Sequence, residues 1–269
     1  MKVTLITATY NSALNIKTCL DSVIDQDYND TEYLIIDGNS FDKTLCIIKK
    51  YQQNYPFIKV VSEKDKGIYD ALNKGINLAS GDIIGFVHSD DFLTTNNIIN
   101  EICSMMKSES LDGVYGDLQY VDEIITKKII RNWKSCHFKP GLLKNGWMPP
   151  HPALFLKKEV YEKHGLFDLS YGISADYDFI LRIFKDSELK FGYLPKVITK
   201  MRVGGASNRS IKNIIQKTKE DFRAIRSNDI GNFLTLVKRI LPSLNNFFKP
   251  CHSIQNQPVK QGSGPKEVR

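Results

Sequence analysis

The feature that most constrains the fold is a regular alternation of strand-like and helix-like segments through residues 1–120. Short apolar runs typical of buried strands stand at residues 2–7, 32–37, 57–62 and 82–87. Apolar residues at helical spacing fill the intervals at 13–25, 40–55 and 67–79, and again at 96–107. Because each helix returns the chain to begin the next strand in the same direction, the pattern predicts an α/β fold with a parallel sheet and helices on both faces.

The second half of the chain is less regular. Residues 113–121 and 124–133 are typical of antiparallel strands, and residues 152–165 of a strand followed by a helix. Helical patterns follow at 175–186, 210–226 and 231–248. We therefore expect a mixed, mainly parallel sheet with a helical extension over residues 206–250. Residues 251–269 have no periodicity and are expected to be disordered.

Composition narrows the class of protein. Hydrophobic residues make up 42% of the 269 residues and charged residues 25%, as in ordinary soluble globular proteins. No apolar run reaches the ~20 residues that span a bilayer, and no charged-then-apolar leader opens the chain, so we expect a cytoplasmic protein. The five cysteines have no metal-ligand spacing, which indicates thiols in a reducing compartment.

The net charge is +7, and the basic excess falls in residues 123–139 and after residue 185. Such an excess is compatible with nucleic acid, an anionic membrane surface or a phosphorylated substrate. A nucleic-acid site would require a basic patch with interleaved aromatic residues. The loops that follow the predicted strands are acidic instead, so we expect no nucleic-acid partner.

Polar loops follow each of the first four predicted strands. These loops are "TATYN" at 7–11, "DGNSFD" at 37–42, "EKDKGIYD" at 63–70 and "HSDD" at 88–91. The carboxyl ends of parallel strands meet at one edge of a sheet, which is where such folds bind ligands. No glycine-rich phosphate-binding motif is present, so a nucleotide bound here would be held by other means.

Two adjacent carboxylates, Asp90 and Asp91, end the fourth predicted strand. Mg2+ and Mn2+ prefer carboxylate and water oxygens together with those of a diphosphate. Successive side chains of a strand point in different directions, so we assign Asp91 to a metal and Asp90 to a ribose hydroxyl or a metal-bound water. The alternative is a turn pair that precedes a helix at Thr94.

Five blocks together carry a resemblance to a known family. They are "VTLITATYNSALNIKTCLDSVIDQDY", "LIIDGNSFDKT", "SEKDKGIYDALNKGI", "ASGDIIGFVHSDD" and "ISADYDFILRI". In order and spacing they resemble family 2 inverting glycosyltransferases, nucleotide-sugar enzymes with the Rossmann-like GT-A fold. The resemblance covers residues 1–205 and implies a nucleotide-sugar half at 1–120 and an acceptor half at 121–205. "EKDKGIYDALNKG" resembles the bacterial branch that builds surface polysaccharides and O-antigens.

The resemblance implies a UDP-sugar donor and roles for particular residues. Asp91 would bind Mn2+ or Mg2+ on the donor diphosphate. Contacts to the nucleotide-sugar would come from Thr7, Ala8, Thr9, Tyr10, Asp37, Lys66, Ser89 and Asp90, with Asp37 reading the uracil. Many relatives carry a second acidic residue after Asp37, where this chain has Gly38.

Asp176 matches the position of the family's general base. Inversion requires a base that deprotonates the acceptor hydroxyl, while a metal ion stabilises the leaving diphosphate. Asp176 lies at the start of a predicted helix, whose dipole favours the charged carboxylate. Asp178 suits a structural role at the same helix end. The residue before Asp176 is often acidic in the family and is Ala175 here.

Several residues of the second half are implied on the acceptor or diphosphate side. His151 and Arg202 would lie near the acceptor or the diphosphate, and Trp147 would either stack on a sugar ring or pack beneath its loop. Gly204 and Gly205 fit a hinge in a segment that closes over the donor. Arg209 is a further candidate for phosphate. A plain turn is the alternative for this segment.

The apolar stripe of the last predicted helix has two interpretations. Phe233, Leu236, Val237, Ile240 and Leu241 share a face, with Lys238 and Arg239 beside them. This arrangement suits peripheral contact with the anionic inner face of the plasma membrane, or packing against the protein itself. We expect Pro242 to break the helix, so that it lies on a membrane without crossing it.

The leading hypothesis is transfer of a hexose or N-acetylhexosamine from a UDP-sugar to a polyprenyl-diphosphate-linked or oligosaccharide acceptor, forming a β-linkage. A nucleotidyltransferase would require a glycine-rich loop where this chain has "TATYNSA". A catalytically degenerate nucleotide-sugar or anionic-surface binding protein is the alternative, and Gly38 and Ala175 are its support.

Overall fold

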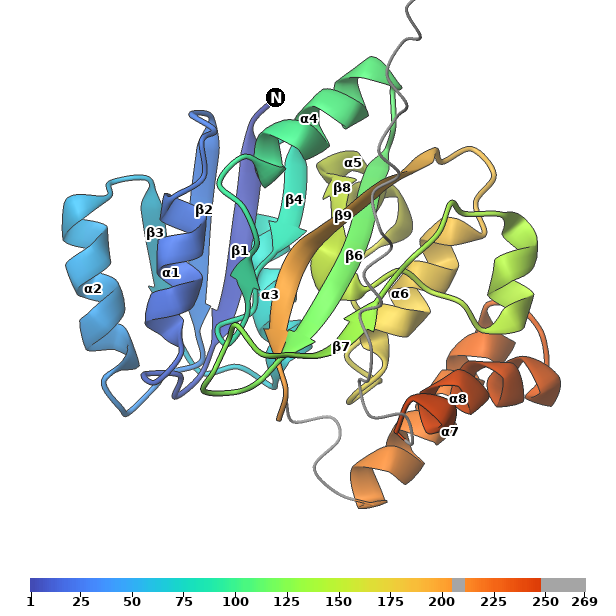
Figure 1. Ribbon diagram of the computed structural model, residues 1–269. Helices are drawn as coiled ribbons and strands as arrows, with labels where there is room; N and C mark the ends of the chain where they lie inside the picture. Colours follow the sequence, from blue (N-terminus) through green and yellow to red (C-terminus); the bar gives the residue numbers. More distant parts are fainter. Residues whose placement is uncertain (205–210, 248–269) are drawn as a thin grey trace, which may run out of the picture.

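The computed structural model describes residues 1–204 and 211–247, and it is built around one curved mixed sheet (Figure 1). Strands β1 (Val3–Thr9), β2 (Thr31–Asp37), β3 (Ile58–Ser62) and β4 (Ile83–Phe86) are parallel in the order β3-β2-β1-β4. Helices α1 (Ile16–Ile24), α2 (Thr44–Asn54) and α3 (Ile68–Leu78) connect them. The alternation predicted for the first half is confirmed.

The second half extends the same sheet with antiparallel and parallel pairs. β8 (Leu154–Lys157) is antiparallel to β4, β6 (Gly113–Val121) is antiparallel to β8, and β9 (Phe191–Arg202) is parallel to β6. β7 (Ile129–Trp133) forms the predicted antiparallel hairpin with β6. Residues 92–93 form the short strand β5 (Phe92–Leu93) on β9, so no helix begins at Thr94. Helix α4 (Ile98–Ser108) matches the helix predicted at residues 96–107.

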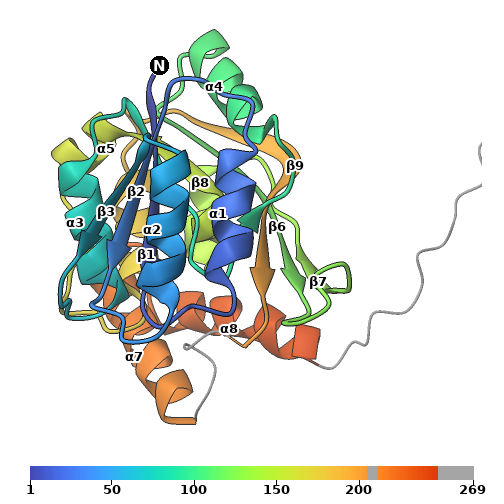
Figure 2. The same cartoon turned by 90° about the vertical axis from the view of Figure 1, so that its left-hand side faces the viewer.

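Two hydrophobic cores cover the two faces of the sheet. One joins α1, α2 and α4 to side chains such as Leu5 and Ile35. The other joins α3, α5 (Lys158–His164) and α6 (Ala175–Phe184) to Ile6, Ile36 and Phe86. Figure 2 shows α3 and α1 on opposite sides of the strands. The alternation of side chains between the two cores fixes the register of each strand. Because strands β1 to β4 are parallel, their carboxyl ends lie at the same edge of the sheet.

The C-terminal helices α7 (Ile211–Ser227) and α8 (Phe233–Phe247) pack below α6 and against the 3-10 turn η1 (Pro140–Asn145) (Figure 1). Leu236 is buried in the core that also holds α6, and Ile240 packs against it. Arg239 pairs with Asp221 at 2.8 Å and lies 3.5 Å from the ring centre of Tyr177. Arg239 is therefore held within the protein, which corrects its expected role beside a membrane.

Two further expectations concern the chain end. Helix α8 continues through position 242, so the expectation that Pro242 ends it is wrong. None of the helices in residues 1–204 and 211–247 is long and apolar enough to cross a membrane. The tail expected to be disordered, residues 251–269, lies outside the described residues.

Candidate active site

The candidate site lies where the strand order reverses, between β1 and β4. In open α/β sheets a crevice forms at this point, beyond the carboxyl ends of the strands. The loops after the two strands are joined by a 2.8 Å hydrogen bond between the hydroxyls of Ser12 and Ser89. Thr7 donates to the carbonyl of Val87 at 2.6 Å and is fully buried. The Thr7 side chain thus faces the core, and it secures the site rather than lining it.

Asp91 is the most unusual carboxylate of the site. Its side chain is 0% exposed, and neither of its oxygens has a hydrogen-bond partner among the described residues. Burial, and to a smaller degree the charge of Asp90, raises the pKa of Asp91 well above its usual range, and Arg202 opposes this shift only in part. A buried carboxylate with no hydrogen-bond partner is costly, because its charge is poorly solvated. A divalent cation would provide the missing partner.

The donor set fits such a cation only in part. In the part of the chain that the structure describes, no group of three His, Cys, Asp or Glu side chains could hold a metal ion. Mg2+ and Mn2+ sites at diphosphates commonly use one or two carboxylates, with the remaining ligands supplied by phosphate oxygens and water. Asp91 with Asp90 beside it matches that pattern.

Arg202, at the end of β9, holds the turn that carries the two aspartates. Its Nη1 donates to the carbonyl of Asp90 at 2.6 Å and its Nη2 to the hydroxyl of Thr18 at 3.2 Å. Its guanidinium also lies 5.3 Å from the ring centre of Phe92. Two of its donor groups are therefore already used in fixing the turn. Of the segment that follows, Gly205 and Arg209 lie outside the described residues.

Asp37 is buried at the end of β2 and is already hydrogen-bonded within the protein. One oxygen accepts from the backbone N–H of Ser40 at 3.0 Å and the hydroxyl of Ser62 at 2.7 Å, and the other accepts from the Ser40 hydroxyl at 2.5 Å. These three bonds close the loop after β2. A contact from Asp37 to a nucleobase would compete with them.

A different carboxylate lies beside Gly38. A Cβ atom added at Gly38 would lie 2.5 Å from Oδ2 of Asp65 and 3.4 Å from the ring of Tyr10. Asp65 therefore occupies the space next to the position where many relatives carry their second acidic residue. Sequence reasoning gave Asp65 no particular role, and the glycine at position 38 was the signal that could have drawn attention to it.

The rest of the predicted nucleotide pocket lies along the same edge. Ala8 and Thr9 end β1 and are buried, and the hydroxyl of Thr9 has no partner among the described residues. Tyr10 is exposed and meets the ring of Phe41 edge-on at 6.1 Å. Lys66 is exposed in the loop between β3 and α3. These side chains form an open, partly aromatic margin beside Asp65.

Asp176 begins α6 on the other side of the site, and Tyr69 of α3 contacts it. The Tyr69 hydroxyl lies 3.0 Å from Oδ1 of Asp176 and 2.6 Å from the carbonyl oxygen of Ile173. Burial and the charge of Asp176 raise the pKa of Tyr69 well above its usual range, so the hydroxyl keeps its proton to donate. Tyr69 was not predicted, although it lies within the block "GIYDALNKG".

Glu220 of α7 holds the loop before Asp176 from the opposite side. Its carboxylate accepts the backbone N–H groups of Gly172, Ile173 and Ser174 at 3.0, 2.8 and 2.9 Å. Burial alone would raise the pKa of Glu220, but the hydrogen bonds from Gln216 and these amides lower it overall. Tyr69 and Glu220 together fix the backbone that presents Asp176.

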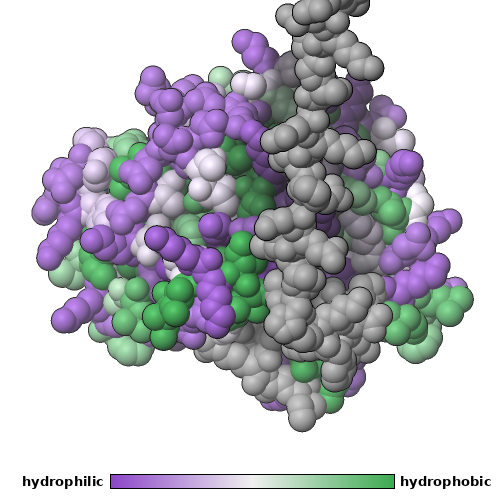
Figure 3. All heavy atoms as spheres, viewed as in Figure 1, coloured by the Kyte–Doolittle hydropathy of each residue, from purple (hydrophilic) through white to green (hydrophobic). Residues whose placement is uncertain are grey.

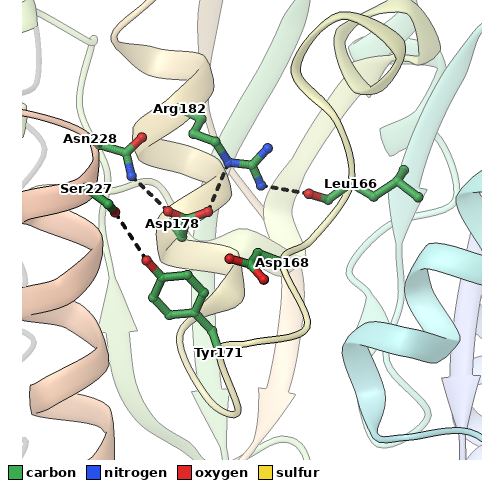
Figure 4. A pocket seen from close by; sticks show the side chains of 7 residues that line it. All are labelled: Leu166, Asp168, Tyr171, Asp178, Arg182, Ser227 and Asn228. Carbon is green, nitrogen blue, oxygen red and sulfur yellow. Dashed lines mark hydrogen bonds and ion pairs between the residues drawn. The ribbon is translucent and has the colours of Figure 1, made fainter.

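Asp178, two residues further along α6, is engaged elsewhere (Figure 4). Its carboxylate accepts Nε of Arg182 at 2.9 Å and Nδ2 of Asn228 at 2.8 Å, in a pocket of about 340 Å³. Tyr171 and Ser227 share a 3.2 Å hydrogen bond in the same pocket. Since its donors and acceptors largely satisfy one another, the pocket joins α6 to α7. Asp178 has the structural role expected of it.

Two histidines lie near Asp176. His151 is buried between Phe86 and Phe167, and its ring centre is 5.9 Å from that of His88. Burial lowers the pKa of His151 to about 4, with the charge of Asp176 opposing the shift and His88 adding to it. His151 is thus neutral at neutral pH and offers a polar nitrogen that no described residue binds.

Trp147 belongs to an aromatic cluster. Its ring centre lies 5.7 Å from Tyr115, 5.5 Å from Phe138 and 5.6 Å from Phe184. Of the two roles left open by the sequence, packing beneath the loop is the one these contacts support.

Comparisons with known proteins agree with this architecture. The chain is 30% identical over 207 residues to a PGL/p-HBAD biosynthesis glycosyltransferase of Mycobacterium bovis, covering 76% of this chain and 78% of that protein. It is 31% identical over 219 residues to a chondroitin synthase of Pasteurella multocida, covering 79% of this chain and 22% of the much longer synthase.

Two solved structures share the fold at low sequence identity. S. aureus TarS 1–349 in complex with UDP-GlcNAc matches with a TM-score of 0.66 and 17% identity, over 85% of this chain and 65% of that one. The mannosyltransferase PcManGT from Pyrobaculum calidifontis, in complex with GDP-Man and Mn2+, matches with a TM-score of 0.60 and 17% identity, over 94% and 76%.

The family itself is established by sequence. Residues 4–163, more than half of the chain, match the model of glycosyl transferase family 2. The fold described above and the resemblance noted in the sequence lead to the same assignment: the chain belongs to glycosyl transferase family 2.

Proposed function

We propose that the protein is a metal-dependent inverting glycosyltransferase of bacterial surface-polysaccharide synthesis, such as O-antigen or capsule. It would transfer a hexose or N-acetylhexosamine from a UDP-sugar to a polyprenyl-diphosphate-linked or oligosaccharide acceptor. The observation that carries the proposal is the buried carboxylate of Asp91 in the loop after β4, which has no hydrogen-bond partner among the described residues. An ordinary structural aspartate in this position would have a donor.

On the donor side, Asp91 would hold Mn2+ or Mg2+ against the diphosphate, and Asp90 would contact a ribose hydroxyl or a metal-bound water. When bound, the cation supplies positive charge that stabilises the leaving nucleoside diphosphate. We assign base recognition to Asp65 as well as Asp37, because Asp65 lies beside Gly38 and Tyr10, whereas the Asp37 oxygens already accept three hydrogen bonds. Lys66, Ser89 and Thr9 remain candidates for further donor contacts.

On the acceptor side, Asp176 would take the proton of the attacking hydroxyl. It begins α6 beside the hydroxyl of Tyr69, which would hold the carboxylate in place to accept that proton. Attack opposite the leaving group converts an α-linked donor into a β-linked product. The neutral imidazole of His151 would hydrogen-bond the acceptor or the diphosphate.

The alternative of a degenerate binding protein rests on Gly38 and Ala175. Asp65 fills the space beside Gly38, and Ala175 is fully buried in the core behind Asp176. Neither departure removes a group that the proposed reaction uses. The active enzyme is therefore the better supported reading.

The test is release of UDP from a panel of UDP-sugars, with and without Mn2+ or Mg2+, using a short polyprenyl-diphosphate sugar as acceptor. We expect metal-dependent turnover with one donor, reduced roughly 100- to 10,000-fold by Asp176→Asn. Asp25→Asn, an exposed carboxylate at the end of α1, is the matched control and should retain full activity. Equal turnover by wild type and Asp176→Asn would refute the assignment of the base.

A further inference from the structure

The hairpin between β6 and β7 carries an apolar surface that the site does not use. Ile124 and Ile125 at its turn are 87% and 59% exposed, and Ile129 and Ile130 on β7 are each 40% exposed. Neither hydrophobic core of the described chain includes any of the four. Single exposed apolar residues are common, but four exposed isoleucines on one hairpin indicate an interaction surface.

Basic residues surround these isoleucines. Residues 122–134 contain Lys127, Lys128, Arg131 and Lys134 against two acidic residues, Asp122 and Glu123. Asp122 is paired with Lys128 at 3.4 Å, and the three lysines are exposed. An apolar tip with a cationic margin complements an anionic lipid surface, where apolar side chains enter the interface and ammonium groups meet the headgroups.

The hairpin leaves the sheet directly beside the candidate site. Val121, the last residue of β6, is in register with Arg202, which holds the carbonyl of Asp90. The backbone N–H of Val203 also donates to Val121 at 2.9 Å. Figure 1 shows β6 and β1 ending at the same lower edge of the sheet, and in Figure 3 that edge carries hydrophobic residues beside hydrophilic ones.

We propose that the β6–β7 hairpin is a membrane-contact element that rests on an anionic bilayer. The four isoleucines enter the lipid interface and the lysines bind the headgroups, which holds the site at the height of the bilayer surface. That this delivers a lipid-linked acceptor to Asp176 rests on the proposed function. The membrane contact itself does not.

Helix α8 is the competing surface, since Phe233 and Leu234 are 64% and 65% exposed. Its basic residues are less available: Arg239 is paired with Asp221, and Lys238 donates to the side chain of Asn145 at 3.0 Å. Charge complementarity therefore favours the hairpin over α8.

The experiment is co-sedimentation of the full chain with vesicles of phosphatidylcholine alone or mixed with phosphatidylglycerol. We expect binding to the anionic vesicles only, weakened by salt. The double variant Ile124→Ser/Ile125→Ser should bind roughly tenfold more weakly or worse, because two exposed apolar side chains lose their burial in lipid. The matched control on α8, Phe233→Ser/Leu234→Ser, should bind like wild type.

The proposal would be overturned by no binding of wild type to anionic vesicles, by equal binding of the hairpin variant, or by loss of binding in the α8 variant alone. UDP release with a water-soluble acceptor separates this result from the proposed function, since the hairpin variant should keep wild-type turnover there. A wild-type dimer that the hairpin variant converts to monomers, without vesicle binding, would assign the surface to self-association instead.

Discussion

Two regions of the molecule bury aspartates in opposite ways. Behind α6, Asp178 is bonded to Arg182 and Asn228, and Asp221 is bonded to Lys217 and Arg239. At the strand ends, Asp91 is equally buried and has no donor among the described residues. The chain therefore pairs its buried carboxylates where they only join helices, and leaves one unpaired where the β1 and β4 loops meet.

The difference distinguishes buried carboxylates that stabilise the fold from one that is available to a ligand. Breaking a buried ion pair leaves an uncompensated charge and destabilises the fold. Neutralising a buried charge that has no partner removes its desolvation cost and stabilises the fold. The same class of substitution should therefore have opposite effects on stability in the two regions.

The largest effect is expected for Asp221→Ala. It strands the buried guanidinium of Arg239, and loss of one partner of a buried pair typically costs about 3–5 kcal/mol. Urea unfolding should show a lower midpoint with an unchanged slope. Asp25→Ala, at an exposed site, serves as the control. A change no larger than that of the control would mean that α8 contributes little to the fold.

Glu220→Gln should have the next largest effect. Hydrogen bonds to a charged group contribute about 1.5–3 kcal/mol. The glutamine side chain has only one acceptor oxygen, so it cannot accept all three backbone N–H groups. We expect loss of roughly 2 kcal/mol in unfolding free energy. Because the folded-state pKa of Glu220 is lowered, its contribution is present at neutral pH and is lost as pH falls through that pKa. A variant with wild-type stability at neutral pH would show that Glu220 does not stabilise the loop before Asp176.

Tyr69→Phe removes the hydroxyl that contacts Asp176. We expect kcat to fall roughly tenfold, equivalent to about 1.4 kcal/mol, with little change in KM. The reason is that the Asp176 carboxylate loses the hydroxyl that holds it in place. Tyr51→Phe, which removes a similar hydrogen bond to Asp21 between α1 and α2, should leave kcat unchanged. An unchanged kcat in both variants would assign Tyr69 to packing alone.

Asp91→Asn should have the smallest effect on stability, and the opposite sign. In the presence of a chelator we expect the variant to be about 1 kcal/mol more stable than wild type at neutral pH. The pKa of Asp91 is raised on folding, so wild type loses stability as pH rises from the unfolded value of about 3.9 through the folded one. The gap between the two proteins should therefore widen from acid to neutral pH. A less stable variant would mean that the carboxylate has a partner after all.

The fold of the first half of this chain could largely be predicted from sequence, because strand and helix periods are local signals. The loops after its strands could be recognised in the same way, and the site roles given to their residues stay predictions. The contacts of Glu220 with the loop before Asp176 could not be predicted. Glu220 binds backbone N–H groups 46 to 48 residues away, and backbone amides carry no sequence signature. Likewise Arg239 had the pattern of a surface cation, and only the packing of α8 against α7 shows that it is buried. Phe92 and Leu93 are too few for any period to predict β5.

The metal role of Asp91 is tested most directly by calorimetric titration of UDP into wild type and Asp91→Asn, with Mn2+ and with chelator. We predict that Mn2+ tightens UDP binding to wild type at least roughly tenfold and has no such effect on the variant, which binds UDP as metal-free wild type does. Equal Mn2+ enhancement in both proteins would place the cation elsewhere. Tight UDP binding without any metal dependence would contradict the reason given for leaving Asp91 unpaired.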